Sequence, residues 1–394
     1  MAMMRIHVVV FKRILQESKE LMKTLHCLLL LTATAVGFPS VAGQNAKSTS
    51  LPAPTVVSAT VGIFTAFQTH PLVGLGDHHR MAQELDFYAA LVHDSRFAKD
   101  IGNVVVEFGG AAQQSTIDRY VAGEDVPYDQ LRKVWADTVG WIPTVTALGY
   151  MNFYAQVRVV NQGLAPEQRI HVWLGDPPVD WSKIRARSDF PEIPDRDRYA
   201  ADLIDSQILA KRKKALVIYG TYHFNGQGSL KELVEQQYPG AFFVVTPYAG
   251  FIEKSCSDAF EQTTRAWPKA AFATPVRNTV LQNQMRSPGC HFQQPGPINF
   301  PTNMTEAQKA QALGDMEDID SGVAGDALLY LGPAASFTWS PFAPDLYLDA
   351  DFREEMNRRS LIRTGKPFSG PSVEDNPMSP RYVRSYGGPE TEQR

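Results

Sequence analysis

The stretch PLVGLGDHH, residues 71–79, is the part of the sequence that decides the fold. Its apolar run stops at a glycine, Gly76, and three titratable side chains follow at once, namely Asp77, His78 and His79. This pattern predicts a buried strand that ends in polar groups. Apolar residues at helical spacing over residues 81–97 predict a helix directly afterwards. Strand, short turn and helix together form the unit of an open α/β sheet, which places its site at the strand ends.

Five further segments repeat this construction. The strands that they predict lie at residues 103–109, 169–176, 214–223, 241–247 and 326–332. The strand ending at His223 is the plainest repeat of the first, because Gly220 and His223 have the same spacing as Gly76 and His79. Most of the intervening segments are long enough for a helix. We therefore predict an α/β fold with a mostly parallel central sheet flanked by helices.

Two insertions stand apart from this regular pattern. Helical periodicity over residues 128–163 predicts a pair of helices longer than a simple crossover requires, and we expect them to form a helical cap. Residues 275–305 are rich in Pro, Gly, Asn and Gln and predict a long irregular loop, such as a lid or binding loop. Further helices are predicted at residues 195–213 and 349–362.

The first 43 residues have the pattern of a secretory signal. Lys23 precedes an apolar run of about 14 residues, and residues 40–42 form a small-x-small cleavage sequence. The run is shorter than the roughly 20 residues that a comfortable membrane span requires. We expect cleavage near Gly43, no stable membrane span afterwards, and a periplasmic or secreted location. An uncleaved N-terminal membrane anchor is the alternative.

Net charge and chain length limit which partners and which domain organisation we expect. The chain of 394 residues has a net charge of −4, and residues 1–43 carry five basic and two acidic groups, a net of +3, which leaves −7 for the rest. A mildly acidic surface argues against nucleic acid as a partner. The partner that we expect, together with the hydrolase function below, is a small-molecule or peptide substrate. The organisation that we predict is a linker at 44–55, one α/β domain at 56–362 and a disordered tail at 363–394.

The expected export determines how the three cysteines are interpreted. Cys27 lies within the signal, which leaves Cys256 and Cys290 in a compartment that permits disulfides. A bond between these two is one expectation, and two free thiols are the alternative. A zinc site on them is less favoured, because neither belongs to a Cys-x-x-Cys pair.

Four titratable side chains fall at or just past the ends of predicted strands: His79, Glu107, Asp176 and His223. The carboxyl ends of parallel strands share one edge of a sheet, so we expect these side chains to converge. Imidazole and carboxylate groups bind borderline divalent metals, and they also serve as general bases without metal. The predicted metal ligands are His79, Glu107 and His223.

Each of these residues has a structural alternative. Asp77 and His78 could cap the following helix, since Asp is a good N-cap. Glu107 lies in the apolar segment VVVEFG, where a carboxylate must be paired or bound to something, and a salt bridge to Arg80 or Arg196 would meet that need. Asp176 could merely begin the turn at the following prolines.

The motifs carry a family resemblance. GLGDHH and a long helix, a strand ending in Glu, the helix start DRDRYAADLI and the segment YGTYH resemble the superfamily of erythromycin esterases, Tiki-type metalloproteases, TraB-type proteins and ChaN-type haem-binding lipoproteins. Its signature is two Gly-x-x-His motifs, a glutamate and an Arg or Asn, matched here by Gly76–His79, Gly220–His223, Glu107, and Arg196 or Arg198. The resemblance covers residues 72–223. The chain departs from the erythromycin esterases at Asp77 and His78, where they have Glu and a longer turn.

Motifs and resemblance together predict a secreted hydrolase. His79, activated or oriented by Asp77 or Glu107, would take a proton from water that attacks an ester or amide, with or without a divalent metal such as Mn, Co or Zn. His223 completes the expected catalytic set, and Arg196 and His78 are the expected substrate contacts. The alternative is a periplasmic haem- or iron-binding protein without turnover, with Tyr219 and Tyr222 as candidate ligands. A non-catalytic scaffold would leave the buried Glu107 unexplained.

Overall fold

A computed structural model describes residues 51–139, 147–192, 195–292, 305–309, 314, 318–319 and 321–368. The predicted signal, most of the predicted linker and most of the predicted tail lie outside these residues. No helix in the described part of the chain is both long enough and apolar enough to cross a membrane.

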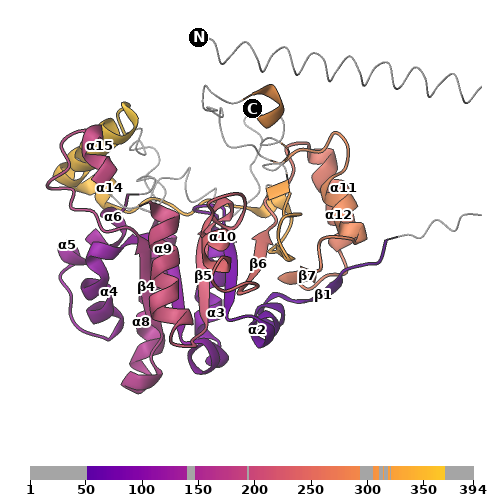
Figure 1. The fold of residues 1–394 in the computed structure, drawn as a ribbon, viewed down its shortest axis with the longest axis horizontal. Helices are drawn as coiled ribbons and strands as arrows, with labels where there is room; N and C mark the ends of the chain where they lie inside the picture. The colour runs from indigo at the N-terminus through magenta and orange to yellow at the C-terminus, as the bar shows by residue number, and fades with distance from the viewer. Residues whose placement is uncertain are drawn as a thin grey trace, which may run out of the picture. The chain divides into compact units, whose positions relative to one another are not determined.

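One eight-stranded sheet forms the centre of the molecule, with the strand order β1-β7-β8-β6-β2-β5-β3-β4 (Figure 1). The strands are β1 (Thr55–Ser58), β2 (Leu72–Asp77), β3 (Asn103–Gly110), β4 (His171–Asp176), β5 (Ala215–Gly220), β6 (Phe242–Pro247), β7 (Ala271–Thr274) and β8 (Ala327–Tyr330). The six from β8 to β4 pair in parallel, and β7 and β1 add antiparallel strands at one edge. The prediction of a mostly parallel α/β fold is confirmed, and all six predicted strands are present.

Helices cover both faces of the sheet. The α-helices are α2 (Ala59–Thr69), α3 (Ala82–His93), α4 (Gln114–Val121), α5 (Tyr128–Leu131), α6 (Lys133–Ala136), α8 (Leu148–Gln162), α9 (Arg196–Ile204), α10 (Leu230–Glu235), α11 (Lys254–Thr264), α12 (Val280–Met285), α14 (Asp345–Leu348) and α15 (Ala350–Thr364). Short 3-10 or π-helical segments are η1 (Phe97–Ile101), η2 (Ala111–Gln113), η3 (Pro166–Gln168), η4 (Arg187–Glu192), η5 (Asp205–Leu209), η6 (Thr221–Phe224) and η7 (Ala334–Ser336).

Alternate residues of each central strand point into different cores. In β5, Leu216 and Ile218 pack with α2, α3 and α8, whereas Val217 and Tyr219 pack with α9 and α10 on the other face. Both sets are buried. A strand buried on both faces needs an apolar residue at nearly every position, which is why these strands read as continuous apolar runs.

The sequence did not reveal β1 and β7. Each has only four residues, and β1 begins at Thr55, the last residue of the predicted linker. The helix pair predicted over residues 128–163 is present as two short helices, α5 and α6, followed by the long helix α8, while residues 140–146 lie outside the described part. The predicted irregular loop contains α12, and its residues 293–304 also lie outside it.

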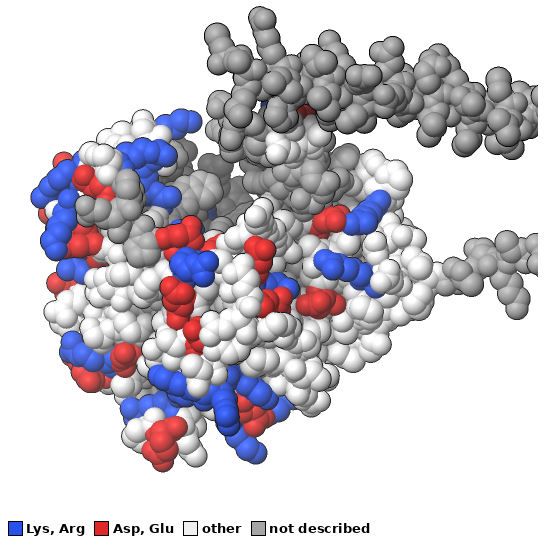
Figure 2. Space-filling view, viewed as in Figure 1, with Lys and Arg blue, Asp and Glu red and all other residues white. Residues whose placement is uncertain are grey.

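The exterior is mixed in charge. On the face in Figure 2, acidic and basic side chains are interspersed over the described residues. That agrees with the small net charge of the whole chain.

The predicted disulfide is present. Cys256 on α11 is bonded to Cys290, with the two Cα atoms 5.7 Å apart, and the bond closes a loop across a sequence separation of 34 residues. Both cysteines pack against a separate core cluster formed by β7, β8, α11 and α12. The bond therefore closes the segment that completes this end of the sheet.

We predict that removing this bond lowers stability without dissolving the parallel sheet. Closing a loop of this length limits the unfolded chain and stabilises the fold by about 3 to 4 kcal/mol. The double substitution Cys256→Ser and Cys290→Ser should therefore lower the free energy of unfolding in urea by that amount. An unchanged free energy of unfolding, or two free thiols in unreduced wild-type protein, would contradict this account.

Candidate functional site

The two Gly-x-x-His motifs face each other on neighbouring strands. β2 and β5 are paired in parallel with Asp77 opposite Gly220. A Cβ on Gly76 would lie 2.7 Å from Thr221 Oγ1, and a Cβ on Gly220 would lie 3.3 Å from His79 Nε2. Because each glycine has no side chain, an atom of the other motif can occupy the space beside it.

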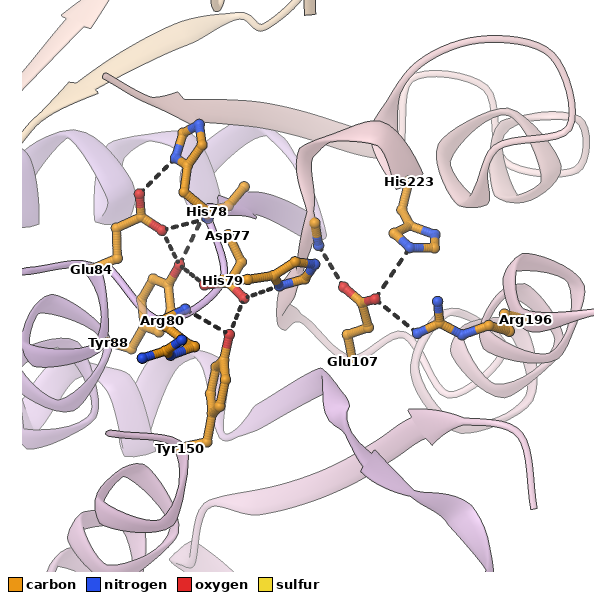
Figure 3. Close-up of polar contacts among 12 residues, drawn as sticks. Asp77, His78, His79, Arg80, Glu84, Tyr88, Glu107, Tyr150, Arg196 and His223 are labelled. Carbon is orange, nitrogen blue, oxygen red and sulfur yellow. Dashed lines mark hydrogen bonds and ion pairs between the residues drawn. The ribbon is translucent and has the colours of Figure 1, made fainter. Parts of the chain in front are cut away.

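Asp77 orients His79. Its Oδ2 lies 2.9 Å from His79 Nδ1 and accepts a hydrogen bond of 2.5 Å from the Tyr150 hydroxyl on α8 (Figure 3). The Tyr88 hydroxyl on α3 lies 3.1 Å from Asp77 Oδ1. Burial raises the pKa of both tyrosines well above 10, with the charge of Asp77 adding to the shift, so both stay protonated and can donate to the carboxylate. With Nδ1 facing Asp77, the Nε2 atom of His79 points toward Gly220 and Glu107.

The turn that carries His79 has an unusual backbone. His79 and Arg80 both have positive φ angles, +28° and +74°. For residues other than glycine this conformation costs roughly 1–2 kcal/mol each. Strain of this kind persists where surrounding contacts determine the conformation, and it is frequent at functional sites.

Glu107 on β3 lies at the centre of the site and is 6% exposed. Its Oε2 accepts a hydrogen bond of 2.6 Å from the backbone N–H of Gly220. Its Oε1 accepts one of 2.8 Å from Arg196 Nη2 and lies 3.3 Å from His223 Nε2. Burial opposes the charged form, but the charges of His223 and Arg196 outweigh it and hold the pKa of Glu107 well below its usual value.

Arg196 and His223 are each paired with a second carboxylate. Arg196, the first residue of α9, donates from Nε to Asp176 Oδ1 at 2.6 Å. Asp176 also accepts a hydrogen bond from the backbone N–H of Val139. His223 Nδ1 contacts Asp197 Oδ1 on α9. Carboxylates and cations therefore alternate across the site, and the salt-bridge alternative for Glu107 is realised with Arg196.

His78 belongs to an adjacent pair. Its Nδ1 lies 2.7 Å from Oε1 of Glu84, a fully buried residue, and its backbone N–H donates to Oε2 of the same carboxylate at 2.8 Å. The N-cap of α3 is Met81, without a side-chain cap, so neither His78 nor Asp77 has the helix-capping role considered above. In Figure 3 the His78 ring points away from His79.

The two motif histidines are strong bases. Burial disfavours their charged forms, but the hydrogen bond with Asp77 and the charge of Glu107 raise the pKa of His79 to about 9. The charge of Glu107 and the contact with Asp197 likewise outweigh burial and raise the pKa of His223 to about 9. Both imidazole rings are therefore protonated on both nitrogens, and positively charged, at neutral pH in this arrangement.

The described residues do not fit the expected divalent metal. His78, His79 and His223 each face a carboxylate through Nδ1, as metal-ligating histidines commonly do. However, both oxygens of Glu107 already have partners, and one of these partners is the Arg196 guanidinium. Within the described residues, no three His, Cys, Asp or Glu side chains form a group that could hold a metal ion. The prediction of a Mn, Co or Zn site on His79, Glu107 and His223 is not supported.

The candidate haem ligands differ in exposure. Tyr219 is buried beneath Gly175, and its hydroxyl has no hydrogen-bond partner within the described part of the chain. Tyr222, in η6 beside His223, is 39% exposed. The Tyr222 side chain is therefore accessible to an external ligand, whereas that of Tyr219 is not.

The structure brings most of the predicted site residues together. His79, Glu107, Asp176, Arg196 and His223 lie within one network of contacts. Sequence reasoning missed four members: Glu84, Tyr88, Tyr150 and Asp197. Glu84 and Tyr88 had a detectable signal, since polar groups four residues apart lie on one face of a helix. Tyr150 had none, because it reaches Asp77 from a segment 73 residues away.

A separate pocket lies near the amino-terminal end of β5. It has a volume of about 450 Å³ and is lined by Phe64, Arg96 and Lys214, among others. It includes none of the predicted site residues.

Comparisons with known proteins yield distant structural similarities alone. No family model matches the chain, and no curated protein matches it. A Bacillus cereus protein solved in structural genomics is 12% identical, with a TM-score of 0.38 over 66% of this chain and 88% of that one. ChaN of Campylobacter jejuni, described with cofacial haem binding, is 14% identical, with a TM-score of 0.32 over 50% and 88%. The C-terminal region of Pasteurella multocida toxin, described with a thiol-protease-like triad, is 11% identical, with a TM-score of 0.31 over 48% and 24%.

We predict that the site makes stability fall at alkaline pH. A histidine whose pKa is about 9 when folded and 6.5 when unfolded stabilises the fold fully below pH 6.5, and this contribution is lost as the pH rises through 9. His79 keeps 39% of its side-chain surface and His223 keeps 19%, so solvent screening reduces the effect to about 2 kcal/mol in total. Urea unfolding between pH 6.5 and 9 measures it.

The matched variants are His223→Gln, which should reduce the loss of stability between pH 6.5 and 9, and His93→Gln, which should leave this loss unchanged. His93 contacts Gln156 at the surface, away from the site. A free energy of unfolding that stays constant over this range would contradict the shared charge network.

Proposed function

We propose that this protein is a hydrolase that acts outside the cytoplasm on an ester or amide in a small molecule or peptide. The observation that carries the proposal is the Asp77–His79 pair, whose Nε2 atom faces Glu107 across Gly220 at the carboxyl edge of the sheet. Sites in open parallel sheets lie at this edge. The two Gly-x-x-His motifs and Glu107 also support membership of the erythromycin esterase, Tiki and ChaN-like superfamily.

His79 is the group that we assign to water activation. Its neutral form takes a proton from water through Nε2 while the water oxygen bonds to the carbonyl carbon. The same proton then passes from Nε2 to the leaving oxygen or nitrogen as the ester or amide bond breaks. Asp77 fixes the tautomer that leaves Nε2 available and stabilises the ring once it is charged.

His223 and Arg196 supply positive charge beside the reacting centre. Negative charge develops on the carbonyl oxygen during attack, and fixed cations stabilise it. His223 has a pKa of about 9 and is charged at neutral pH, so it suits this role. Arg196 already pairs with Glu107 and Asp176, and these contacts suit a role in holding the site together. Direct substrate contacts by Arg196 and His78 stay predictions.

Haem binding is the second candidate, and the exposed Tyr222 beside His223 is the observation that favours it. A phenolate oxygen is a known iron ligand in haem proteins. Titration of the purified chain with haemin separates the two functions. Saturable binding with a shifted Soret band that is lost in Tyr222→Phe supports haem binding, and an unshifted band counts against it.

We predict that hydrolysis depends on the site as a unit. His79→Asn, Glu107→Gln and His223→Asn should each lower kcat/KM on an active aryl ester by about 100-fold or more, and the double variant His79→Asn with His223→Asn should be little worse than the more severe single change. Because neutral His79 is required, wild-type activity should rise toward pH 9.

The control is His93→Gln, which should retain wild-type turnover. A panel of aryl esters and chromogenic amides, assayed after treatment with chelator, provides the measurement. Full turnover by His79→Asn would remove His79 from the reaction, and no turnover on any substrate by wild-type protein would count against the function itself.

A further inference from the structure

The segment 336–342, which we call the C-terminal strap, contacts the turn that carries His79 although it lies about 260 residues further along the chain. The Ser340 N–H donates to the Arg80 carbonyl at 2.7 Å. The Arg80 guanidinium donates back to the Ser340 carbonyl through Nε at 3.1 Å and Nη2 at 3.0 Å. The same guanidinium lies 3.7 Å from the ring centre of Phe342. Arg80 is thus bound through its backbone and its side chain.

The strap also contacts the start of α8. Ser340 Oγ accepts a hydrogen bond of 2.9 Å from the Gly149 N–H, and the Pro341 carbonyl accepts one of 2.7 Å from Leu148. The residue that follows Gly149 is Tyr150, whose hydroxyl donates to Asp77. The buried Ser340 therefore joins the two segments that fix the Asp77–His79 pair, one through the turn and the other through the tyrosine.

We propose that Arg80 and Ser340 are positioning residues, which hold His79 against Asp77 by binding the left-handed turn and the start of α8 to one strap. The turn has positive φ at two consecutive residues that are not glycine, so contacts from outside it must select that conformation. The contacts with Ser340 and Phe342 are made by Arg80 itself. The last part of the chain, which the Gly-x-x-His resemblance does not cover, thereby becomes part of the site.

Three variants test this inference. Arg80→Ala removes the paired hydrogen bonds and the contact with Phe342, and Arg80→Lys keeps the charge but loses the paired geometry. Ser340→Ala removes the acceptor for Gly149 and keeps the backbone bonds to Arg80. The matched control is Gln83→Ala, which removes contacts to Ser336 and Thr338 on the same strap without touching Arg80.

The readout is the titration of the His79 ring by NMR in chelator-treated purified protein, with the resonance assigned from its absence in His79→Asn. In wild-type protein the pKa should be about 9. Each Arg80 variant and Ser340→Ala should lower it by about one pH unit or more, because the bond to Asp77 and the closeness of Glu107 depend on the turn. Gln83→Ala should leave it unchanged. Arg80→Lys keeps the charge and is the variant expected to fold if Arg80→Ala does not.

The inference rests on the proposed function only for the role of His79, so the two can fail separately. In the assay above, the Arg80 variants should lower kcat by about tenfold or more with little change in KM. A pKa that falls in a protein without hydrolytic activity supports the positioning role and counts against the hydrolase. A ring that still titrates near 9 in folded Arg80→Lys, or one that shifts equally in Gln83→Ala, overturns the positioning role.

Discussion

The buried carboxylate of Glu107 is the interaction on which the rest of the site depends. It contacts three elements that lie far along the chain from β3: β5 through the Gly220 N–H, α9 through Arg196, and η6 through His223. A carboxylate in an apolar strand is costly unless it is paired and hydrogen-bonded, and here both oxygens have partners. Its negative charge in turn raises the pKa of both motif histidines. The charge of Glu107 therefore both holds these elements together and sets the protonation of the two histidines.

The glycines and the strap complete the geometry that Glu107 begins. His79 Nε2 and Glu107 Oε2 project into the space beside Gly220. A Cβ added at Gly220 would lie 3.3 Å from each of these two atoms. The strained turn after β2 aims the histidine at that space, and Arg80 binds this turn to the strap. Backbone strain at one point is thus offset by hydrogen bonds and packing from the end of the chain.

The sequence predicts the parts of this molecule that depend on local pattern. Six apolar runs became the six parallel strands, and the parallel arrangement alone implied that His79, Glu107 and His223 would meet at one edge. It did not predict the contacts between segments that lie far apart in the chain. Tyr150 and Ser340 reach the site from segments whose approach depends on tertiary packing, and the short antiparallel strands β1 and β7 lie outside the repeated apolar runs. The described residues do not support the metal prediction for a similar reason, since the pairing of Arg196 with Glu107 is not visible in the spacing of the expected ligands.

The charge state of Glu107 tests the central claim most directly. Protein labelled with ¹³C at the glutamate side-chain carboxyl reports each titration, and the Glu107 signal is the one absent in Glu107→Gln. The account predicts that this signal keeps its ionised shift from neutral pH down to pH 4, because its pKa lies well below the usual value of about 4.3. A Glu107 carboxyl that titrates at 4.3 or above in folded protein would contradict a site built around its charge.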